Sequence, residues 1–347
     1  MSQASSIAKG DLEHVLTHTG PYWEAIRGKA LFLTGGTGFF GTWLLESFAY
    51  INEKLALDAN ITILSRDPGK FSKRIPHLAG RKDISFLRGD ISDFVFPHGA
   101  FQFVVHAAAP TFLPNSIKEQ IELFDTIVLG TRRVLEFAVQ GGTKNLLFTS
   151  SGAVYGPQPT DIHNLSESYN GSPDTLNPMS AYGNAKRAAE QLCALFGQEY
   201  SINVSIARCF AFVGPALRLD GHYAAGNFIR DGIRGGPIRV KSDGSSFRSY
   251  LYGADLAVWL WTMLFASSSI GVFNVGSNEA ISISELAACV AVKFKCKIAY
   301  IEHSEATTAK SSGRYVPDIS KAQKEFNLSV RVPLDEAIER TAKWALL

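Results

Sequence analysis

The feature that most constrains how this chain can fold is a glycine-rich segment that directly follows a short apolar run. Residues 29–34 (KALFLT) have the composition of a strand buried in a parallel sheet, and residues 34–41 (TGGTGFFG) carry glycines at a GxxGxxG spacing. The residues around 43–50 predict a helix. A strand, a glycine-rich turn and a helix in this order are typical of a site that binds the pyrophosphate of a dinucleotide.

The three glycines of this turn have separate expected roles. Gly35 allows a tight turn, Gly38 lets the backbone approach the pyrophosphate, and Gly41 lets the helix pack closely on the strand. The helix N-terminus adds free amide groups and a partial positive charge. A glycine-rich loop without a ligand is the alternative, which both flanking elements disfavour. We expect the turn to contact the cofactor through Gly35, Thr37, Gly38, Phe39, Phe40 and Gly41.

Strands and helices are predicted to alternate through the first 210 residues. Further strands are expected at residues 61–64, near 86, and at 103–105, 145–149 and 204–207, with long helices at 119–140 and 182–200. This alternation is typical of βαβ units. The sequence therefore predicts an α/β fold with a Rossmann-like, doubly wound parallel sheet, whose ligands lie at the carboxyl ends of the strands.

The chain length of 347 residues exceeds what one core usually organises, so a second, smaller part is expected. Residues 1–28 predict a helical lead-in and residues 29–210 the dinucleotide-binding domain. In residues 211–347 the alternation of strands and helices gives way to loops rich in Gly, Pro and Arg. These residues predict mainly a C-terminal substrate-binding domain. A strand within about 250–276 is expected to return to the sheet.

Composition excludes several classes of partner. The chain has 34 Lys and Arg residues against 32 Asp and Glu, a net charge of +2, so no general field attracts nucleic acid or a membrane. Four widely spaced cysteines, without histidines at ligand spacing, predict reduced thiols and no metal site. The N-terminal residues are charged where a signal peptide is apolar, and no stretch is long enough to span a bilayer. We therefore expect a cytoplasmic protein.

The end of the second predicted strand bears on the choice of dinucleotide. An acidic residue there accepts from the 2′-hydroxyl of the adenine ribose in NAD, whereas Ser65 followed by Arg66 suits the 2′-phosphate of NADP. NADP is therefore favoured, and NAD stays open because Asp67 lies one residue further on. Asp90 and Ile91 are expected beside the adenine, with a turn cap as the alternative role of Asp90.

A tyrosine and a lysine four residues apart carry the predicted chemistry. Tyr182 and Lys186 lie on one face of the predicted helix, where an ammonium group lowers the pKa of a phenol and makes it a better proton shuttle. Residues 148–156 (FTSSGAVYG) bring hydroxyl groups to the end of a strand, and Ser151 is suited to hydrogen-bond the same substrate oxygen. A tyrosine and a lysine at this spacing usually lie on a solvated helix face. Combined with the glycine-rich turn and the serine-containing strand end, they are specific for an enzyme of this chemistry.

With these segments combined, the sequence resembles the extended short-chain dehydrogenase/reductase family, and within it the nucleotide-sugar epimerases, dehydratases, decarboxylases and ketoreductases. The resemblance covers nearly the whole chain and matches Ser151, Tyr182 and Lys186 to the Ser/Tyr/Lys triad of that family. It implies that Tyr182 moves the proton of a sugar hydroxyl, that Lys186 also holds the nicotinamide ribose, and that hydride moves to or from the nicotinamide. Cofactor contacts are also implied for His106, Ala107 and Ala108.

The resemblance further implies a nucleotide-diphosphate sugar as substrate. Ser150 and Ser151 are expected at the sugar, and Asn227 and Arg248 at the diphosphate, for which guanidinium geometry is suited. The alternatives are a helix cap for Asn227 and a surface ion pair for Arg248. A homodimer through the helix that carries Tyr182 and its neighbour is expected on the same basis.

Two positions depart from the family pattern in a way that narrows the chemistry. Members that eliminate water or carbon dioxide carry acidic residues just after the triad serine, where this chain has Gly152 and Ala153. A 4,6-dehydratase or a decarboxylase is therefore disfavoured. The sequence favours an NADPH-dependent reductase of a 4-keto sugar nucleotide, with a 4-epimerase that retains NAD as the alternative and a non-catalytic dinucleotide sensor as the least favoured class.

Overall fold

The computed structural model describes residues 6–109, 114–221, 223–301 and 313–347 of the chain. These residues form two compact units. The first unit comprises residues 1–156, 170–209 and 257–273, and the second comprises residues 157–169, 210–256 and 274–347. Each unit is thus assembled from three separate stretches of the sequence.

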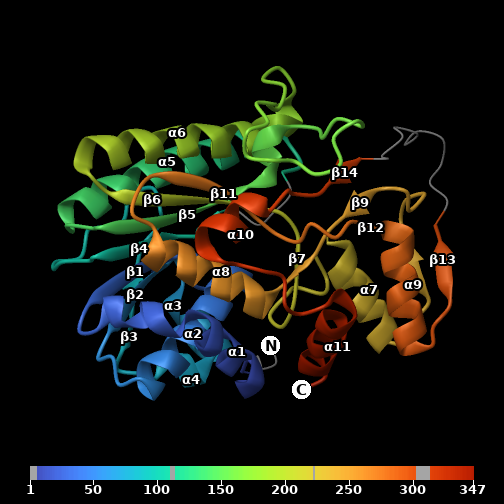
Figure 1. The fold of residues 1–347 in the computed structure, drawn as a ribbon, viewed down its shortest axis with the longest axis horizontal. Helices are drawn as coiled ribbons and strands as arrows, with labels where there is room; N and C mark the ends of the chain where they lie inside the picture. The colour runs from blue at the N-terminus through green and yellow to red at the C-terminus, as the bar shows by residue number, and fades with distance from the viewer. Residues whose placement is uncertain (1–5, 110–113, 222, 302–312) are drawn as a thin grey trace. The chain divides into compact units, whose positions relative to one another are not determined.

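A seven-stranded sheet in the order β11-β6-β5-β4-β1-β2-β3 is the centre of the first unit (Figure 1). The five pairings from β6 to β3 are all parallel. Because the strand order reverses beside β1, this is the doubly wound arrangement, and the predicted fold class is confirmed. The strands are β1 (Ala30–Thr34), β2 (Asn60–Ser65), β3 (Ile84–Arg88), β4 (Phe103–His106), β5 (Asn145–Ser151), β6 (Asn203–Cys209) and β11 (Gly271–Val275).

Helices cover both faces of this sheet, with α5 and α6 on one face and α2 on the other (Figure 1). The helix α5 starts where the hydroxyl oxygen of Ser116 accepts from the amide of Glu119 at 3.2 Å, a side-chain N-cap. The helices of this unit are α1 (Lys9–Thr19), η1 (Gly20–Ile26), α2 (Phe39–Lys54), α3 (Pro68–Arg74), α4 (Pro76–Ala79), α5 (Ile117–Gln140), η2 (Gly152–Tyr155), η3 (Pro178–Ser180) and α6 (Ala181–Tyr200). The helix α8 (Gly253–Ala266) belongs to this unit from residue 257 onward.

Aromatic side chains fill the core between the sheet and α5. The ring of Phe32 on β1 lies 4.3 Å from that of Phe137 on α5, and Phe101 lies 5.2 Å from Phe137, measured between ring centroids. All three rings are buried. Truncating such a side chain to alanine typically costs about 3–5 kcal/mol of folding free energy, so this cluster anchors α5 on the sheet.

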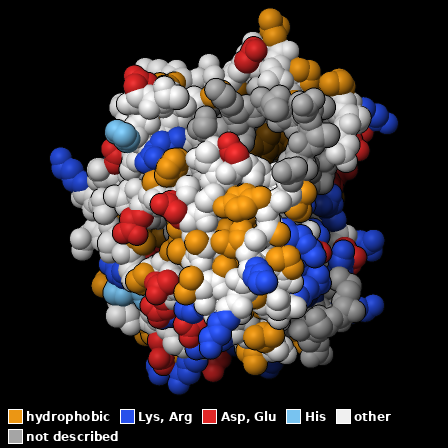
Figure 2. Space-filling model, turned by 90° about the vertical axis from the view of Figure 1, so that its right-hand side faces the viewer, with side chains coloured by type: hydrophobic (Ala, Val, Ile, Leu, Met, Phe, Trp, Pro, Cys, Tyr) orange, Lys and Arg blue, Asp and Glu red, His pale blue; other side chains and the backbone are white. Residues whose placement is uncertain are grey.

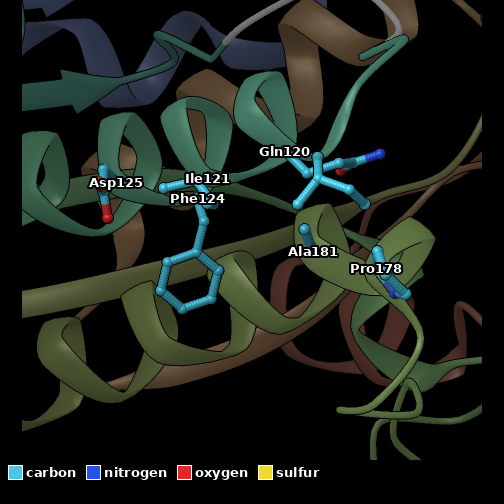
Figure 3. A pocket seen from close by; sticks show the side chains of 7 residues that line it. Gln120, Ile121, Phe124, Asp125, Pro178 and Ala181 are labelled. Atoms are coloured by element: carbon cyan, nitrogen blue, oxygen red, sulfur yellow. The ribbon is translucent and has the colours of Figure 1, made fainter.

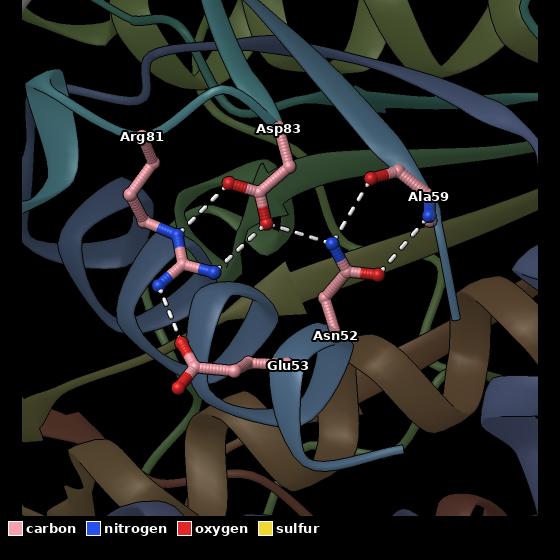
Figure 4. A network of polar contacts seen from close by, with 5 residues as sticks. All are labelled: Asn52, Glu53, Ala59, Arg81 and Asp83. Atoms are coloured by element: carbon pink, nitrogen blue, oxygen red, sulfur yellow. Dashed lines mark hydrogen bonds and ion pairs between the residues drawn. The ribbon is translucent and has the colours of Figure 1, made fainter. Parts of the chain in front are cut away.

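A polar network fixes the end of α2 to the starts of β2 and β3 (Figure 4). The amide nitrogen of Asn52 donates to the carboxylate of Asp83 at 2.7 Å and to the carbonyl of Ala59 at 3.0 Å, while the amide of Ala59 donates back to Asn52 at 3.1 Å. Arg81 pairs with both Asp83 and Glu53. The network lies at the amino ends of the strands, so it fixes the geometry of the sheet away from the glycine-rich turn.

The described residues of the second unit form short strands and helices, among them α7, α9, α10 and α11. Its sheets are β10-β7, β12-β9-β14 and β13-β8. On the face viewed in Figure 2, acidic and basic side chains both occur, with hydrophobic side chains between them. Among the described helices of the chain, none is both long and apolar enough to cross a membrane. The elements are β7 (Phe212–Val213), α7 (Ala224–Ile233), β8 (Ile238–Val240), β9 (Phe247–Arg248), β10 (Leu251–Tyr252), β12 (Ile281–Ser282), α9 (Ile283–Phe294), β13 (Ile298–Tyr300), β14 (Arg314–Tyr315), α10 (Ser320–Phe326) and α11 (Leu334–Ala345).

Candidate active site

The glycine-rich turn joins the end of β1 to the start of α2, and its geometry requires glycine at two positions. Gly35 has φ of +77°, and a Cβ there would lie 2.5 Å from the backbone of Ala107. A Cβ at Gly41 would overlap the backbone of Gly36. Gly38 is the N-cap of α2, is exposed, and has no side-chain cap. The open helix N-terminus and the close backbone fit the pyrophosphate of a dinucleotide.

A chain of hydrogen bonds connects the loop beside this turn to α5. The amide of Ala108 donates to the hydroxyl of Thr34 at 3.1 Å, and that hydroxyl is 2.8 Å from Nδ1 of His106. On the other side of the ring, Nε2 is 3.0 Å from the hydroxyl of Thr131, which donates to the carbonyl of Ile127 at 2.6 Å. The Thr131 hydroxyl donates to Ile127, so it accepts from Nε2, while the Thr34 hydroxyl donates to Nδ1. His106 therefore carries its proton on Nε2.

The side chain of His106 is therefore a structural element of the loop. Burial, and after it the positive charge of Lys186, lowers the pKa of His106 to about 3, so the ring is neutral at physiological pH. Any contact of this segment with a cofactor has to come from the backbone of His106 or from the half-buried residues Ala107 and Ala108.

Phe39 and Phe40 are the first two residues of α2. Their ring centroids are 5.9 Å apart, and both residues are half-buried.

At the end of β2, the structure assigns different tasks to the three residues that bear on the cofactor. Ser65 is buried, and its hydroxyl accepts from the amide of Asp67 at 3.3 Å. The carboxylate of Asp67 caps α3 by accepting from the amide of Lys70 at 2.9 Å. Arg66 is exposed, and the described residues include no ion-pair partner for it. One oxygen of the acidic side chain thus caps a helix, and the basic side chain of Arg66 is exposed beside it.

Asp90 and Ile91 occupy the corresponding place after β3. One carboxylate oxygen of Asp90 accepts from both the amide and the hydroxyl of Ser92, at 3.1 and 2.8 Å, which is the turn-capping arrangement considered as its alternative role. Ile91 is buried against Gly130 of α5, where an added Cβ would lie 2.8 Å from it. A contact of either residue with adenine stays a prediction.

Lys186 is almost completely buried, with 2% of its surface exposed, on the side of α6 that faces β5. Its ammonium donates to the carbonyl of Thr149 at 2.8 Å and lies 4.7 Å from the ring centroid of Phe148 and 6.0 Å from that of Tyr182. Burial lowers the pKa of Lys186 to about 8, although the nearby Cys209, Cys193 and Glu190 oppose this shift. The lysine is thus an ammonium at neutral pH, close to the predicted catalytic phenol.

Ser151 and Tyr182 come from the end of β5 and the first turn of α6. Ser151 caps η2, with its hydroxyl oxygen accepting from the amide of Ala153 at 3.2 Å. Gly183 is the third residue of α6, and a Cβ there would be only 2.6 Å from the carbonyl oxygen of Ala153 and 2.7 Å from Pro173. Glycine therefore lets α6 approach η2 closely. The sequence pattern offered no signal for this role of Gly183.

An ion pair that the sequence did not reveal lies one helical turn beyond Lys186. The carboxylate of Glu190 is 2.7 Å from the guanidinium of Arg208 on β6 and accepts from the hydroxyl of Ser150 at 2.5 Å. Arg208 also stacks on Tyr155, 4.6 Å from its ring centroid. The hydroxyl of Ser150, predicted to contact the sugar, is buried and turned toward α6. The spacing of Glu190, four residues after Lys186, was the only available signal.

The two predicted diphosphate contacts belong to the second unit. Asn227 lies on α7, where its side-chain oxygen accepts from Arg230 at 2.9 Å, so it does not cap the helix as its alternative role required. Arg248 on β9 is half-buried and donates to the carbonyls of Phe247 at 2.7 Å and Gly313 at 2.9 Å. Arg248 therefore makes backbone contacts in place of the surface ion pair considered as its alternative.

A second arginine lies next to Arg248 on the neighbouring strand. In the register of β14 and β9, Arg314 is opposite Phe247 and Tyr315 is opposite Arg248. The guanidinium of Arg314 is 5.3 Å from the ring of Phe247, and that of Arg248 is 5.9 Å from the ring of Tyr315. Arg314 is too far along the chain from residue 248 for any local motif to connect them, so sequence reasoning missed it.

An apolar depression lies on the outer surface of α5 and the start of α6 (Figure 3). Ile121 and Phe124 project from α5, while Pro178 begins η3 and Ala181 begins α6. The residues around it are largely exposed, including Ile121 with 57% of its surface accessible.

In the part of the chain that the structure describes, no cluster of three His, Cys, Asp or Glu side chains could hold a metal ion.

Comparisons with known proteins identify sequences and folds similar to this chain. UDP-glucuronic acid decarboxylase 1 of Arabidopsis thaliana is 29% identical over 308 residues, which cover 89% of this chain and 68% of the relative. The structure of the UDP-glucose 4-epimerase of Thermotoga maritima with UDP-glucose superposes with a TM-score of 0.73 at 20% identity, covering 91% of this chain and 98% of the other. That of MoeE5 with UDP-glucose and NAD superposes with a TM-score of 0.73 at 24% identity, covering 92% and 98%.

The two structural similarities concern the fold, because identity is low in both. The family assignment rests on a separate comparison. The model of the NAD dependent epimerase/dehydratase family matches residues 31–276, which span the glycine-rich turn, the segment with Ser151, Tyr182 and Lys186, and the strand β11. This match covers well over half of the chain and agrees with the predicted family resemblance and nicotinamide cofactor. The chain belongs to the NAD dependent epimerase/dehydratase family.

Proposed function

We propose that this protein is an oxidoreductase that acts at C4 of a nucleotide-linked sugar and reduces a 4-keto sugar nucleotide with NADPH. The observation that carries the proposal is the buried ammonium of Lys186, held by the carbonyl of Thr149 beside the ring of Tyr182. A cation in this place stabilises the phenolate form of a tyrosine. Tyr182 is thereby suited to exchange a proton with a substrate oxygen at neutral pH.

The bound nicotinamide supplies the hydride, and the chain supplies the proton. Tyr182 donates its phenolic proton to the keto oxygen as that oxygen becomes a hydroxyl, while Lys186 stabilises the phenolate that remains. Ser151, at the end of β5, orients the same oxygen through its hydroxyl. The approach of α6 to η2 that Gly183 permits supports this assignment, because it brings the helix with Tyr182 to the segment that Ser151 caps.

Elimination is not part of the proposal, although the relatives that are similar in sequence include UDP-glucuronic acid decarboxylases. The residues that follow Ser151 are Gly152 and Ala153, neither of which has a carboxylate. Glu190, the buried acid one turn beyond Lys186, is bound to Arg208 and to Ser150. Its commitment to these partners disfavours it as a substitute acid or base for a second chemical step.

The proposed substrate class is a nucleoside-diphosphate sugar. Similar proteins are named for UDP-glucuronic acid and UDP-glucose. In the second unit, Arg248 on β9 presents a guanidinium group next to the ring of Tyr315. A guanidinium group offers paired donors to diphosphate oxygens, and aromatic rings stack on nucleobases. Asn227 is proposed as a further contact to the diphosphate.

A C4 epimerase is the second candidate, because the description of the matching family includes epimerases. The side chains of Ser151, Tyr182 and Lys186 are also suited to an oxidation that is followed by a reduction. The two candidates differ in how they treat the cofactor. A reductase consumes NADPH and releases the oxidised form, whereas an epimerase retains NAD through the catalytic cycle. The exposed guanidinium of Arg66 at the end of β2 suits the 2′-phosphate of NADPH and hence favours the reductase.

Two measurements test the proposal. Denaturing the purified protein and identifying any released dinucleotide reveals whether NAD is retained, and a screen of 4-keto sugar nucleotides with NADPH reveals reductase activity. We expect NADPH oxidation with at least one of these substrates and its loss in Tyr182→Phe. Stoichiometric bound NAD without NADPH consumption would replace the reductase by the epimerase. Turnover that survives in Tyr182→Phe would contradict both.

The same proposal includes a homodimer that buries the apolar depression of α5 and α6. A soluble protein rarely leaves neighbouring apolar side chains exposed without a partner. Ile117 and Ile121 have 60% and 57% of their surfaces accessible on one side of α5, and Met179 has 71% in η3, just before α6. A second copy of the chain would present the same apolar surface and cover it symmetrically.

A further inference from the structure

The guanidinium of Arg74 lies against the glycine-rich turn, 37 residues away in sequence. It comes from the last residue of α3 and donates through Nη2 to the carbonyl of Thr37 at 2.5 Å. Its carbon Cζ is 5.9 Å from the ring centroid of Phe71 on the same helix. Its Nε is buried and has no hydrogen-bond partner among the described residues. Nε is therefore a buried donor without a partner in the described part of the chain.

Basic side chains dominate the segment from which Arg74 comes. Residues 65–74 (SRDPGKFSKR) contain four basic residues and one acidic residue. The acidic residue, Asp67, caps α3 through one carboxylate oxygen, which accepts from the amide of Lys70 at 2.9 Å. Arg66 is exposed at the end of β2. This segment thus brings two guanidinium groups, those of Arg66 and Arg74, and a net positive charge to the neighbourhood of the turn.

We propose that Arg74 is a specificity-determining residue for the cofactor, which binds the 2′-phosphate of the adenine ribose together with Arg66. In a doubly wound fold, the adenine ribose lies between the glycine-rich turn and the end of the second strand, so Thr37 and Arg66 mark its two sides. A guanidinium is planar and offers paired donors to phosphate oxygens. The unpartnered Nε of Arg74 is the kind of donor that such a phosphate satisfies.

This inference rests on the part of the proposed function that concerns the dinucleotide and does not depend on the sugar. The competing explanation is that Arg74 only supports the turn through Thr37. The two explanations differ in what they predict for ligands that lack the 2′-phosphate. A supporting role affects NAD and NADP equally, whereas a specificity role affects NADP selectively.

The experiment is isothermal titration calorimetry of the full-length protein, freed of nucleotide, with NADP⁺ and NAD⁺ and with the fragments adenosine 2′,5′-bisphosphate and 5′-AMP. The wild type is expected to bind each ligand that carries the 2′-phosphate at least tenfold more tightly than its partner. Arg74→Ala should lose roughly 10- to 100-fold of its affinity for NADP⁺, the range for a hydrogen-bonded charged group, and less than about threefold for NAD⁺.

Two further variants separate charge from support and from folding. Arg74→Gln retains an amide donor for the carbonyl of Thr37 but no charge, so it should lose NADP⁺ affinity while NAD⁺ affinity stays unchanged. Lys54→Ala removes the same charge from an exposed position at the other end of α2 and should leave both affinities as in the wild type. Circular dichroism melting without nucleotide checks that each variant is folded.

Equal losses for NADP⁺ and NAD⁺ in both Arg74 variants would overturn the proposal in favour of a supporting role. A wild type that binds NADP⁺ no more tightly than NAD⁺ would also overturn it. Since no sugar is present, these results are independent of catalysis. Failure of every 4-keto sugar nucleotide as a substrate, combined with the expected binding pattern, would reject the proposed reductase and leave the role of Arg74 intact.

Discussion

Lys186 and Thr149 are joined by a 2.8 Å hydrogen bond from the lysine ammonium to the backbone carbonyl, which ties α6 to the fifth strand of the sheet. The bond directs the charge of a buried side chain toward the end of β5, where the strand runs into Ser151. Burial lowers the pKa of this lysine from its ordinary range to about 8. The catalytic proposal therefore depends on a group that titrates close to physiological pH.

The first prediction concerns the pH dependence of turnover. Below its pKa of about 8 Lys186 is an ammonium, and above that pH it loses the charge that stabilises the Tyr182 phenolate. For NADPH-dependent reduction we expect kcat/KM to fall by about tenfold per pH unit above this value. In Lys186→Arg, whose guanidinium stays protonated, the falling limb should move to higher pH at a reduced rate. An unmoved limb would mean that another group controls it.

The second prediction concerns the approach of α6 to η2. In Gly183→Ala the new methyl group would lie 2.6 Å from the carbonyl oxygen of Ala153, so the start of α6 has to shift. We expect a loss of stability of about 1–3 kcal/mol and a larger fall in kcat than rise in KM, because Tyr182 is displaced from Ser151. Steady-state kinetics and urea unfolding measure both effects.

The control for this substitution is Gly10→Ala in α1, where nothing lies within 4 Å of the added Cβ. It should leave kcat unchanged and the free energy of unfolding the same or slightly higher, since alanine favours a helix. If Gly183→Ala behaved like this control, the packing of α6 on η2 would not position the catalytic tyrosine.

The third prediction compares a buried with an exposed ion pair. Glu190→Gln leaves the guanidinium of Arg208 without a counter-charge in the interior, which typically costs about 3–5 kcal/mol. Glu136→Gln breaks the exposed pair with Arg132 on α5, at 3.0 Å, and should cost less than about 1 kcal/mol. Urea unfolding of both variants, monitored by tryptophan fluorescence, gives the comparison. Equal costs would show that the pair of Glu190 is effectively solvated.

The sequence predicted those parts of the fold that depend on local patterns. The apolar run before Gly35 and the glycines after it specify a strand, a turn and a helix within about twenty residues, and the structure places β1 and α2 there. The alternation of later strands and helices then left the doubly wound sheet as the simplest topology. Tyr182 and Lys186 could be paired for the same reason, since four residues along a helix bring them to one face.

The features that the sequence did not reveal all depend on contacts between distant segments. Arg74 meets Thr37 only because α3 folds back over the turn, and Gly183 meets Ala153 only because α6 packs on η2. Ser150 was expected at the sugar because it adjoins Ser151, yet successive residues of a strand point to opposite faces. Its hydroxyl accordingly turns to Glu190 on α6.

The last prediction concerns assembly. Phe124 lies in the apolar depression on α5, and a charged side chain there would have to be buried without a partner in the proposed homodimer. We expect the wild type to elute as a dimer in size-exclusion chromatography with light scattering, and Phe124→Glu to have half that mass at micromolar concentration. Val292→Glu, at a residue of α9 with 79% of its surface exposed, is the matched control and should remain dimeric. A monomeric wild type would contradict the proposed homodimer. A Phe124→Glu variant that stays dimeric would show that the dimer interface lies outside the apolar depression.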